Sequence, residues 1–152
     1  MRVALYQPDI PQNTGTVLRM AACLGLPVEV IEPCGFVWGG KHMRRSGMDY
    51  LDQVDVTRHL DWPAFQGALA GQRRVLLTTK SDQPYTEFQF EPGDIVMLGR
   101  ESAGVPDDVH NAVDVRLTIP LKPNLRAFNL AVATAMVTGE ALRQLDGFPE
   151  IG

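Results

Sequence analysis

The stretch Ile95-Val96-Met97-Leu98-Gly99-Arg100-Glu101-Ser102-Ala103-Gly104-Val105-Pro106 decides the fold. Its four apolar residues at 95–98 predict a buried strand, and the glycines at 99 and 104 allow a tight turn with close backbone approach to a ligand. A helix is expected to begin near Pro106, because the two aspartates that follow are favourable in a first turn. A strand, a Gly-rich polar loop and a helix start are the usual anatomy of a ligand site in an α/β sheet.

Two known motifs fit this loop poorly. The nucleophile elbow of serine hydrolases needs Gly-x-Ser-x-Gly, and Arg100 stands where its first glycine should be. The dinucleotide fingerprint G-x-G-x-x-G does not match the loop either. A serine hydrolase that uses Ser102 with His59 or His110 therefore stays open as a weaker alternative.

A second informative segment follows a strand expected at residues 2–6. In this segment Asn13 or Thr14 is expected to cap a helix that runs to Leu24. Arg19 lies about a turn and a half beyond the cap. From these residues alone, Arg19 is no more than a solvated arginine of a helix.

A third segment, residues 119–130, contains two closely spaced prolines. Pro120 and Pro123 favour an extended, irregular path. Asn129 is expected to cap the helix that follows, whose apolar residues recur at helical spacing along one stripe.

Apolar runs and helical patterns alternate along the whole chain. This alternation predicts an α/β fold in a single domain, residues 1–152, with a mostly parallel sheet and helices on both faces. Strands are expected near 2–6, 28–31, 54–57, 74–79, 95–98 and 115–118, and helices near 13–24, 62–70, 105–111 and 129–145.

The composition is that of a globular protein and argues against several other classes. Of the 152 residues, 45% are hydrophobic and 21% are charged, and no apolar run reaches the length of a membrane span. Two cysteines are too few for a disulfide framework, and we expect Cys23 to be a core residue of the first helix. The three histidines are scattered, so no metal site is expected. We expect a cytoplasmic protein, since the sequence opens with a strand and not with a signal peptide.

Residues 35–42 come close to the P-loop pattern. His42, however, replaces the Ser or Thr that would hold magnesium, and residues 44–47 make a poor first turn for the required helix. We therefore interpret residues 35–47 as a flexible loop that carries a basic patch.

The charge of the chain gives a mixed signal. A net charge of −4 argues against non-specific binding of nucleic acid. The densest basic cluster consists of Lys41, Arg44 and Arg45, with Trp38 close by for stacking. Such a loop can steer a phosphate backbone locally, even on an acidic protein.

Taken in order, three motifs resemble those of the SPOUT superfamily of RNA methyltransferases. Pro11-Gln12-Asn13-Thr14-Gly15 with Arg19 looks like the first motif, residues 99–106 look like the second, and residues 119–130 look like the third. The order and spacing agree over nearly the whole chain. The short sequence is similar to the minimal tRNA (cytidine(34)-2'-O)-methyltransferase subgroup, also at Gly35-Phe36, Arg44-Arg45, Asp49-Tyr50 and Thr78-Thr79-Lys80.

The resemblance implies a fold and an activity. The fold is the SPOUT type with a C-terminal trefoil knot, an exception to the usual rule of chain threading. The activity is transfer of a methyl group from S-adenosylmethionine, without a metal, to a ribose 2'-hydroxyl of tRNA at the wobble pyrimidine, position 34. The family builds its substrate site from two subunits, so we expect a homodimer that binds the anticodon stem-loop of tRNA and no membrane.

The resemblance also implies roles for individual residues. It assigns Arg19 to the hydroxyl and the adjacent phosphate, Asn13 to the substrate side, and Glu101 to the loop or to an ion pair with Arg19. An arginine with a pKa above ~12 is a poor base, so Arg19 either has a much lower pKa or stabilises phosphate and alkoxide. Cofactor binding, largely by backbone groups, is expected at Leu77, Thr78, Gly99, Glu101, Gly104, Ile119, Leu121 and Ala127, and RNA binding at Lys41, Arg44, Arg45 and Arg126.

The chain departs from the family pattern at a few positions. Alanine stands at 127 where serine is usual, Ala131-Val132 where Ser-Asn is usual, Gly139 where a tyrosine is common, and Arg100 where proline is frequent. An RNA-binding module that has lost catalysis is therefore a second alternative. An assay of methyl transfer into tRNA distinguishes the leading hypothesis from both alternatives, the RNA-binding module and the hydrolase.

Overall fold

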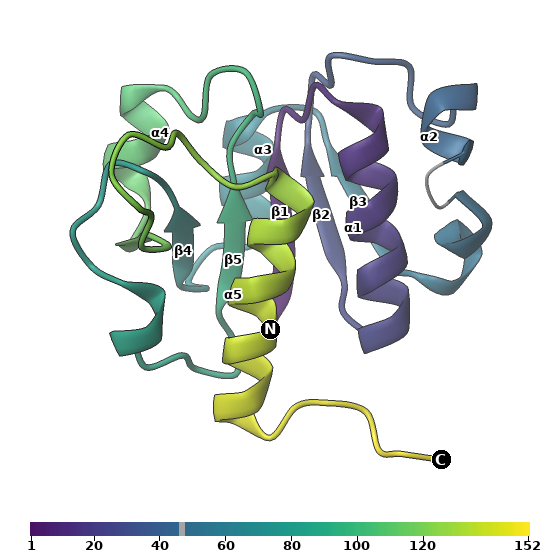
Figure 1. The fold of residues 1–152 in the computed structure, drawn as a ribbon. Helices are drawn as coiled ribbons and strands as arrows, with labels where there is room; N and C mark the ends of the chain where they lie inside the picture. The colour runs from purple at the N-terminus through teal and green to yellow at the C-terminus, as the bar shows by residue number, and fades with distance from the viewer. Residues whose placement is uncertain (46–47) are drawn as a thin grey trace.

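Six short strands form one parallel sheet at the centre of the structure, a computed structural model that describes residues 1–45 and 48–152 (Figure 1). The spatial order of the strands is β3-β2-β1-β5-β4-β6. Buried parallel strands are continuous apolar runs, which is why they were visible in the sequence. The strands are β1 (Arg2–Tyr6), β2 (Val28–Ile31), β3 (Val56–His59), β4 (Arg74–Leu77), β5 (Ile95–Leu98) and β6 (Val115–Leu117).

Helices cover both faces of this sheet, as predicted. On one face, α1 (Pro11–Leu24) and α5 (Leu130–Leu145) lie side by side and share a core with Val3 and Leu5 of β1. The other face packs on α3 (Trp62–Ala68) and α4 (Asp107–Ala112). Shorter elements are α2 (Lys41–Arg45) and the 3₁₀ turns η1 (Met48–Gln53) and η2 (Tyr85–Glu87).

The start of α1 corrects one prediction. The helix begins at Pro11, with Ile10 at the N-cap and no capping side chain, so neither Asn13 nor Thr14 is the cap. Proline is well suited to the first helical position, because it has no N–H to satisfy and its φ is already helical. Asn13 and Thr14 are therefore buried inside the first turns, where their side chains serve other contacts.

The cap of α5 is confirmed. The Asn129 side chain accepts hydrogen bonds from the backbone N–H groups of Ala131 and Val132. The two aspartates at 107 and 108 lie in the first turn of α4, again as predicted.

Two further predictions were wrong, both for reasons of local geometry. Cys23 is exposed, because α1 turns that position away from the face that carries Val17, Leu18 and Ala21. Residues 41–45 form the short helix α2 and not an irregular loop. Ser46 and Gly47, which entered the argument against a P-loop, lie outside the described residues.

The strand order places a topological switch point between β1 and β5. The chain moves outward from β1 to β2 and β3, and then crosses to the other side of β1, where β5 lies next to β1 and β4 and β6 lie farther out. The strands of Figure 1 point the same way, so the loops after β1 and β5 meet at one edge. Ligands of open α/β sheets bind outside the carboxyl ends of strands at such a point. In the part of the chain described, no helix has the length and apolar character needed to cross a bilayer.

Candidate cofactor and RNA site

A cavity of about 520 Å³ opens at the carboxyl ends of β4, β5 and β6. Its size falls in the usual range for small-molecule sites, roughly 300–1,000 Å³. Every residue predicted to bind the cofactor lines it: Leu77, Thr78, Gly99, Glu101, Gly104, Ile119, Leu121 and Ala127. These residues come from three separate loops, so only the folded sheet brings them together.

The Gly99–Gly104 loop forms one wall of the cavity and closes on itself. The Arg100 N–H donates to the Gly104 carbonyl at 3.0 Å, and the Gly104 N–H donates back to the Arg100 carbonyl at 2.8 Å. Gly104 has φ +65°, and a Cβ at Gly99 would lie 2.6 Å from the Gly104 carbonyl carbon. Both glycines are therefore required by the backbone of this loop.

A row of polar side chains joins the three motifs at the rim of the cavity. The Asn129 amide donates to Asn13 Oδ1 at 3.0 Å, and the Asn13 amide donates to Glu101 Oε1 at 3.4 Å. Because Asn13 does not cap α1, its side chain is available for the hydrogen bonds with Asn129 and Glu101. All three residues line the cavity.

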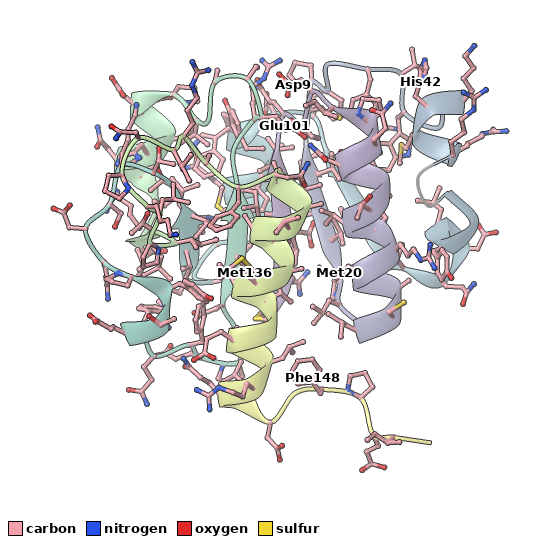
Figure 2. The ribbon with its side chains drawn as sticks, in the orientation of Figure 1. Asp9, Met20, His42, Glu101, Met136 and Phe148 are labelled. Atoms are coloured by element: carbon pink, nitrogen blue, oxygen red, sulfur yellow. The ribbon has the colours of Figure 1, made fainter. Side chains whose placement is uncertain are left out.

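Glu101 continues this row to Asp9, which follows β1. The two residues lie together at the carboxyl ends of the strands (Figure 2). The Asp9 backbone N–H donates to Glu101 Oε2 at 2.9 Å, and the Asp9 side chain accepts from the Ser102 hydroxyl. Burial, and then the neighbouring Asp9 carboxyl, raise the pKa of Glu101, while the hydrogen bond with Glu101 lowers the pKa of Asp9.

Arg19 does not join this cluster. It is exposed on α1, with its guanidinium over the Tyr50 ring at 5.1 Å from the centroid. Glu101 is bonded to Asp9 and Asn13, whereas the contact described for Arg19 is with Tyr50, so the pairing of Glu101 with Arg19 stays a prediction. Arg19 lies six residues beyond Asn13, roughly 9 Å along the helix axis.

The predicted RNA-binding residues are exposed. Lys41, Arg44 and Arg45 lie on α2, which packs against α1, and Arg126 lies in the segment before α5. Arg44 is held by a hydrogen bond of 2.8 Å from Nε to the Gly39 carbonyl. Trp38 is stacked under Arg58, whose guanidinium lies 5.0 Å from the ring centroid.

The hydrolase alternative finds no support in the contacts of its residues. The Ser102 hydroxyl donates to Asp9, and His59 is bonded at 2.6 Å to buried Glu29 and packs against Phe65 of α3. His110 lines the cavity, whereas Ser102 does not. Within residues 1–45 and 48–152, no group of three or more His, Cys, Asp or Glu is placed to hold a metal ion.

The comparison with protein families decides the classification. The family model described as the SpoU rRNA Methylase family matches residues 1–139. This chain belongs to the SpoU rRNA Methylase family. The resemblance read from the three motifs is thereby confirmed.

Relatives of this SpoU family chain have closely similar length. A tRNA (cytidine(34)-2'-O)-methyltransferase of Beijerinckia indica is 56% identical over 151 residues, which cover 98% of this chain and 94% of the relative. The enzyme of the same name from Escherichia coli K12 is 40% identical, over 98% and 96% of the two chains.

Solved structures agree with the sequence relatives. A structure described as giving insights into the 2-OH methylation of C/U34 on tRNA has a TM-score of 0.91 and 39% identity, over 96% of both chains. An AdoMet-bound rRNA methyltransferase from Sinorhizobium meliloti shares the fold, with a TM-score of 0.85 at 23% identity over 95% of this chain and 56% of that one.

Three parts of the site were missed by sequence reasoning. They are Asp9, the contacts of Arg100 with Asp9 and Gln7, and a place in the cavity lining for Thr79, Lys80 and His110, which the sequence indicated only in other connections. The signal for Asp9 is an acidic residue three positions after a buried strand. That signal becomes informative only once β1 and β5 are known to be neighbours.

Proposed function

We propose that this SpoU family member transfers a methyl group from S-adenosylmethionine to the ribose 2'-hydroxyl of tRNA, at the pyrimidine of position 34. The observation that carries the proposal is that all eight residues that the motifs assign to the cofactor line one cavity. The 56% and 40% identical relatives bear the name of this activity over almost their whole length, which supports it further.

The cavity suits S-adenosylmethionine in size and in lining. Leu77, Ile119 and Leu121 offer apolar side chains beside the backbone N–H and C=O groups at the strand ends, where adenine and ribose find both apolar and polar contacts. Because these contacts are largely backbone, alanine at 127 in place of serine is compatible with binding. When bound, the cofactor supplies the methyl group as an electrophile.

The residues of the chain then have to position a hydroxyl and manage its proton. Positioning supplies a large part of the rate of a two-substrate reaction. Asn13, fixed between Asn129 and Glu101, forms the substrate side of the cavity rim. Arg19 binds the phosphate next to the target ribose and stabilises the developing alkoxide.

The position of Arg19 supports a homodimer. Arg19 is exposed and outside the lining of its own chain's cavity, and in a homodimer it would reach the cavity of the second subunit. The α1 and α5 layer offers partly buried Met20 and Met136 for such a contact (Figure 2). Val132 of α5 is exposed. Isologous pairing of this layer would place two α2 helices around one tRNA stem.

The proposed RNA target is the anticodon stem-loop. An unstacked loop ribose enters a pocket without melting a duplex. Lys41, Arg44, Arg45 and Arg126 are exposed to contact stem phosphates, and such contacts make binding salt-dependent. Trp38, whose ring already stacks with Arg58, is the candidate for contact with a base.

Four finer features complete the proposal. They are a single domain over residues 1–152, a C-terminal trefoil knot, a cytoplasmic location with the tRNA pool, and no membrane partner. The path of the chain supports the knot: after β6 at the sheet edge, residues 118–129 return across the carboxyl ends before α5 begins beside α1 (Figure 1).

One assay tests the proposal against both alternatives. The protein is incubated with methyl-labelled S-adenosylmethionine and bulk tRNA, and the methylated nucleotide is mapped by mass spectrometry. We expect a 2'-O-methyl group at position 34. Absence of transfer despite tRNA binding would identify a non-catalytic RNA-binding module, and a methyl group only outside the anticodon loop would overturn the target. Calorimetry with S-adenosylhomocysteine should give one site per subunit, and light scattering a mass near twice 16.7 kDa.

A further inference from the structure

Asp9, at the acidic end of the polar row, has no role in the function proposed above. Asp9 and Glu101 are two carboxyl groups from the loops after neighbouring strands, β1 and β5. Asp9 Oδ2 accepts from the Ser102 hydroxyl and lies 3.7 Å from Arg100 Nη2. Asp9 Oδ1 is buried and has no hydrogen-bond partner among the described residues. A buried acceptor without a donor is destabilising, so a donor is to be expected here.

Glu101 is the group placed to supply that donor. We propose that Asp9 and Glu101 share one proton, donated by the Glu101 carboxyl to Asp9 Oδ1, and that this carboxyl pair fastens the Gly99–Gly104 loop to the start of α1. Asp9 is then a positioning residue. It does not line the cavity, but it acts on the cavity wall through Glu101, which does.

The surroundings of the pair favour one proton over none. Two ionised carboxylates in contact repel each other, and partial burial strengthens the repulsion. Burial and the proximity of Asp9 raise the pKa of Glu101, whereas the bond from Glu101, the Ser102 hydroxyl and Arg100 lower that of Asp9. The proton is therefore held on the Glu101 side. The Cys34 thiol also faces Glu101, but burial raises its pKa to about 11, so it adds no charge near neutral pH.

The geometry is fixed from two more directions. A Cβ at Gly35 would lie 2.6 Å from Asp9 Cβ, so the 33–36 segment closes against the far side of Asp9. A protonated Glu101 still accepts from the Asp9 and Asn13 donors, because each of its oxygens keeps a lone pair. One proton therefore satisfies the orphaned oxygen without breaking any existing bond.

A pH window follows from the directions of the two pKa shifts. As the pH rises through the raised pKa of Glu101, the shared proton is lost, the carboxylates repel, and the loop loosens. As the pH falls through the lowered pKa of Asp9, the interaction of Asp9 with Arg100 is lost. The loop is best ordered between these two values. The consequence for cofactor affinity rests on the proposed function, but the proton itself does not.

The first measurement follows the proton without any ligand. In protein labelled with ¹³C at the Asp and Glu carboxyl carbons, Asp9 and Glu101 should show a common inflection above the ordinary range for glutamate. In Glu101→Gln the amide replaces the carboxyl proton, so the Asp9 signal should lose that inflection. Glu150→Gln, which changes an exposed carboxyl of the C-terminal tail, should leave both signals unaltered. Independent titration of Asp9 and Glu101 at ordinary values would overturn the proposal.

The second measurement links the proton to the loop. Amide exchange at Arg100 and Gly104, whose N–H groups close the loop, should accelerate in the wild type above the common inflection. The Kd for S-adenosylhomocysteine should weaken by at least about threefold per pH unit there, approaching about tenfold at full coupling. Glu101→Gln should remove the pH dependence of both profiles, whatever its absolute Kd, because Glu101 itself lines the cavity. Asp9→Ala should give weak binding and fast exchange at every pH.

The proposed function and the shared proton can be refuted independently of each other. If S-adenosylhomocysteine does not bind at any pH, the proposed function fails, while the carboxyl titration and amide exchange still decide the shared proton. If the ligand binds with the same pH profile in wild type and Glu101→Gln, the carboxyl pair has no role in the loop. Asp9→Asn serves as a second variant, since its amide can donate to an ionised Glu101 and should also flatten the profile.

Discussion

The side-chain amide of Asn129 donates a hydrogen bond of 3.0 Å to Oδ1 of Asn13, although 116 positions separate the two residues in the chain. The other end of the same side chain caps α5 through the N–H groups of Ala131 and Val132. One asparagine thus fixes the start of α5 and attaches it to the first turn of α1, at the rim of the cavity.

Substitutions of Asn129 can separate the contribution of the α5 cap to stability from that of the hydrogen bond to Asn13. Asn129→Ala loses the cap and the bond to Asn13, so we expect the free energy of unfolding to fall by about 2 kcal/mol. Asn129→Ser retains a capping oxygen and loses only the bond, and should cost about 1 kcal/mol. Urea unfolding monitored by circular dichroism measures both values. Equal losses in the two variants would show that the cap contributes nothing.

The elements of the fold were largely predictable, and the errors have local causes. β1, β2 and β5 are nearly continuous apolar runs between polar or glycine-containing turns, which makes buried parallel strands recognisable. The start of α1 was misplaced because an asparagine usually caps, whereas proline at the first helical position made a side-chain cap unnecessary. The strand order depends on contacts between distant residues, which no local pattern records.

The site was predictable only where a motif carried it. The cavity residues at 77–78, 99–104 and 119–127 come from segments that resemble family motifs, and the fold brings them together. Asp9 was not predicted as a site residue, because its position beside Glu101 depends on the pairing of β1 with β5. The sequence also did not predict that Arg19 lies outside its own cavity, since the exposure of one helix position depends on what packs beside it.

Gly99 provides a test of the loop backbone. In Gly99→Ala the new Cβ would lie 2.6 Å from the Gly104 carbonyl carbon, and the loop has to shift. We expect a loss of about 1–3 kcal/mol in stability and at least tenfold in affinity for S-adenosylhomocysteine, measured by calorimetry. Gly67→Ala in α3 is the matched control, because its Cβ meets nothing within 4 Å. The control should raise stability by about 0.5–1 kcal/mol and leave affinity unchanged.

Glu29 tests a buried ionic cluster remote from the cavity. Its carboxylate is 2% exposed and bonds both Arg2 and His59 at 2.6 Å. Glu29→Ala leaves Arg2 without its counter-charge and His59 without its hydrogen bond to Glu29, and should lower the free energy of unfolding by about 3 kcal/mol. Glu32→Ala removes the partner of exposed Arg58 and should cost less than about 1 kcal/mol. Equal effects in the two variants, read from urea unfolding, would contradict the role given to burial.

The proposed contact between the basic residues of α2 and RNA can be tested through the salt dependence of binding. If Arg45 neutralises a tRNA phosphate, Arg45→Ala should weaken binding and reduce the slope of log K against log salt concentration by about 0.7–0.9. Arg143→Ala is the control, since Arg143 is exposed near the end of α5 and paired with Glu140. Filter binding of an anticodon stem-loop between low and physiological salt gives both slopes. An unchanged slope for Arg45→Ala would remove α2 from the RNA interface.

Arg19 provides the most direct test of a shared site. Arg19→Ala should abolish methyl transfer and leave affinity for S-adenosylhomocysteine nearly intact, because the residue is exposed and lies outside the cavity lining. Mixing this variant with Gly99→Ala then distinguishes one subunit from two. If Arg19 serves the cavity of its partner, half of the dimers in an equal mixture contain one intact site, which restores about a quarter of the wild-type rate. If Arg19 acts on its own cavity, the mixture stays as inactive as its components, and the two-subunit site is refuted.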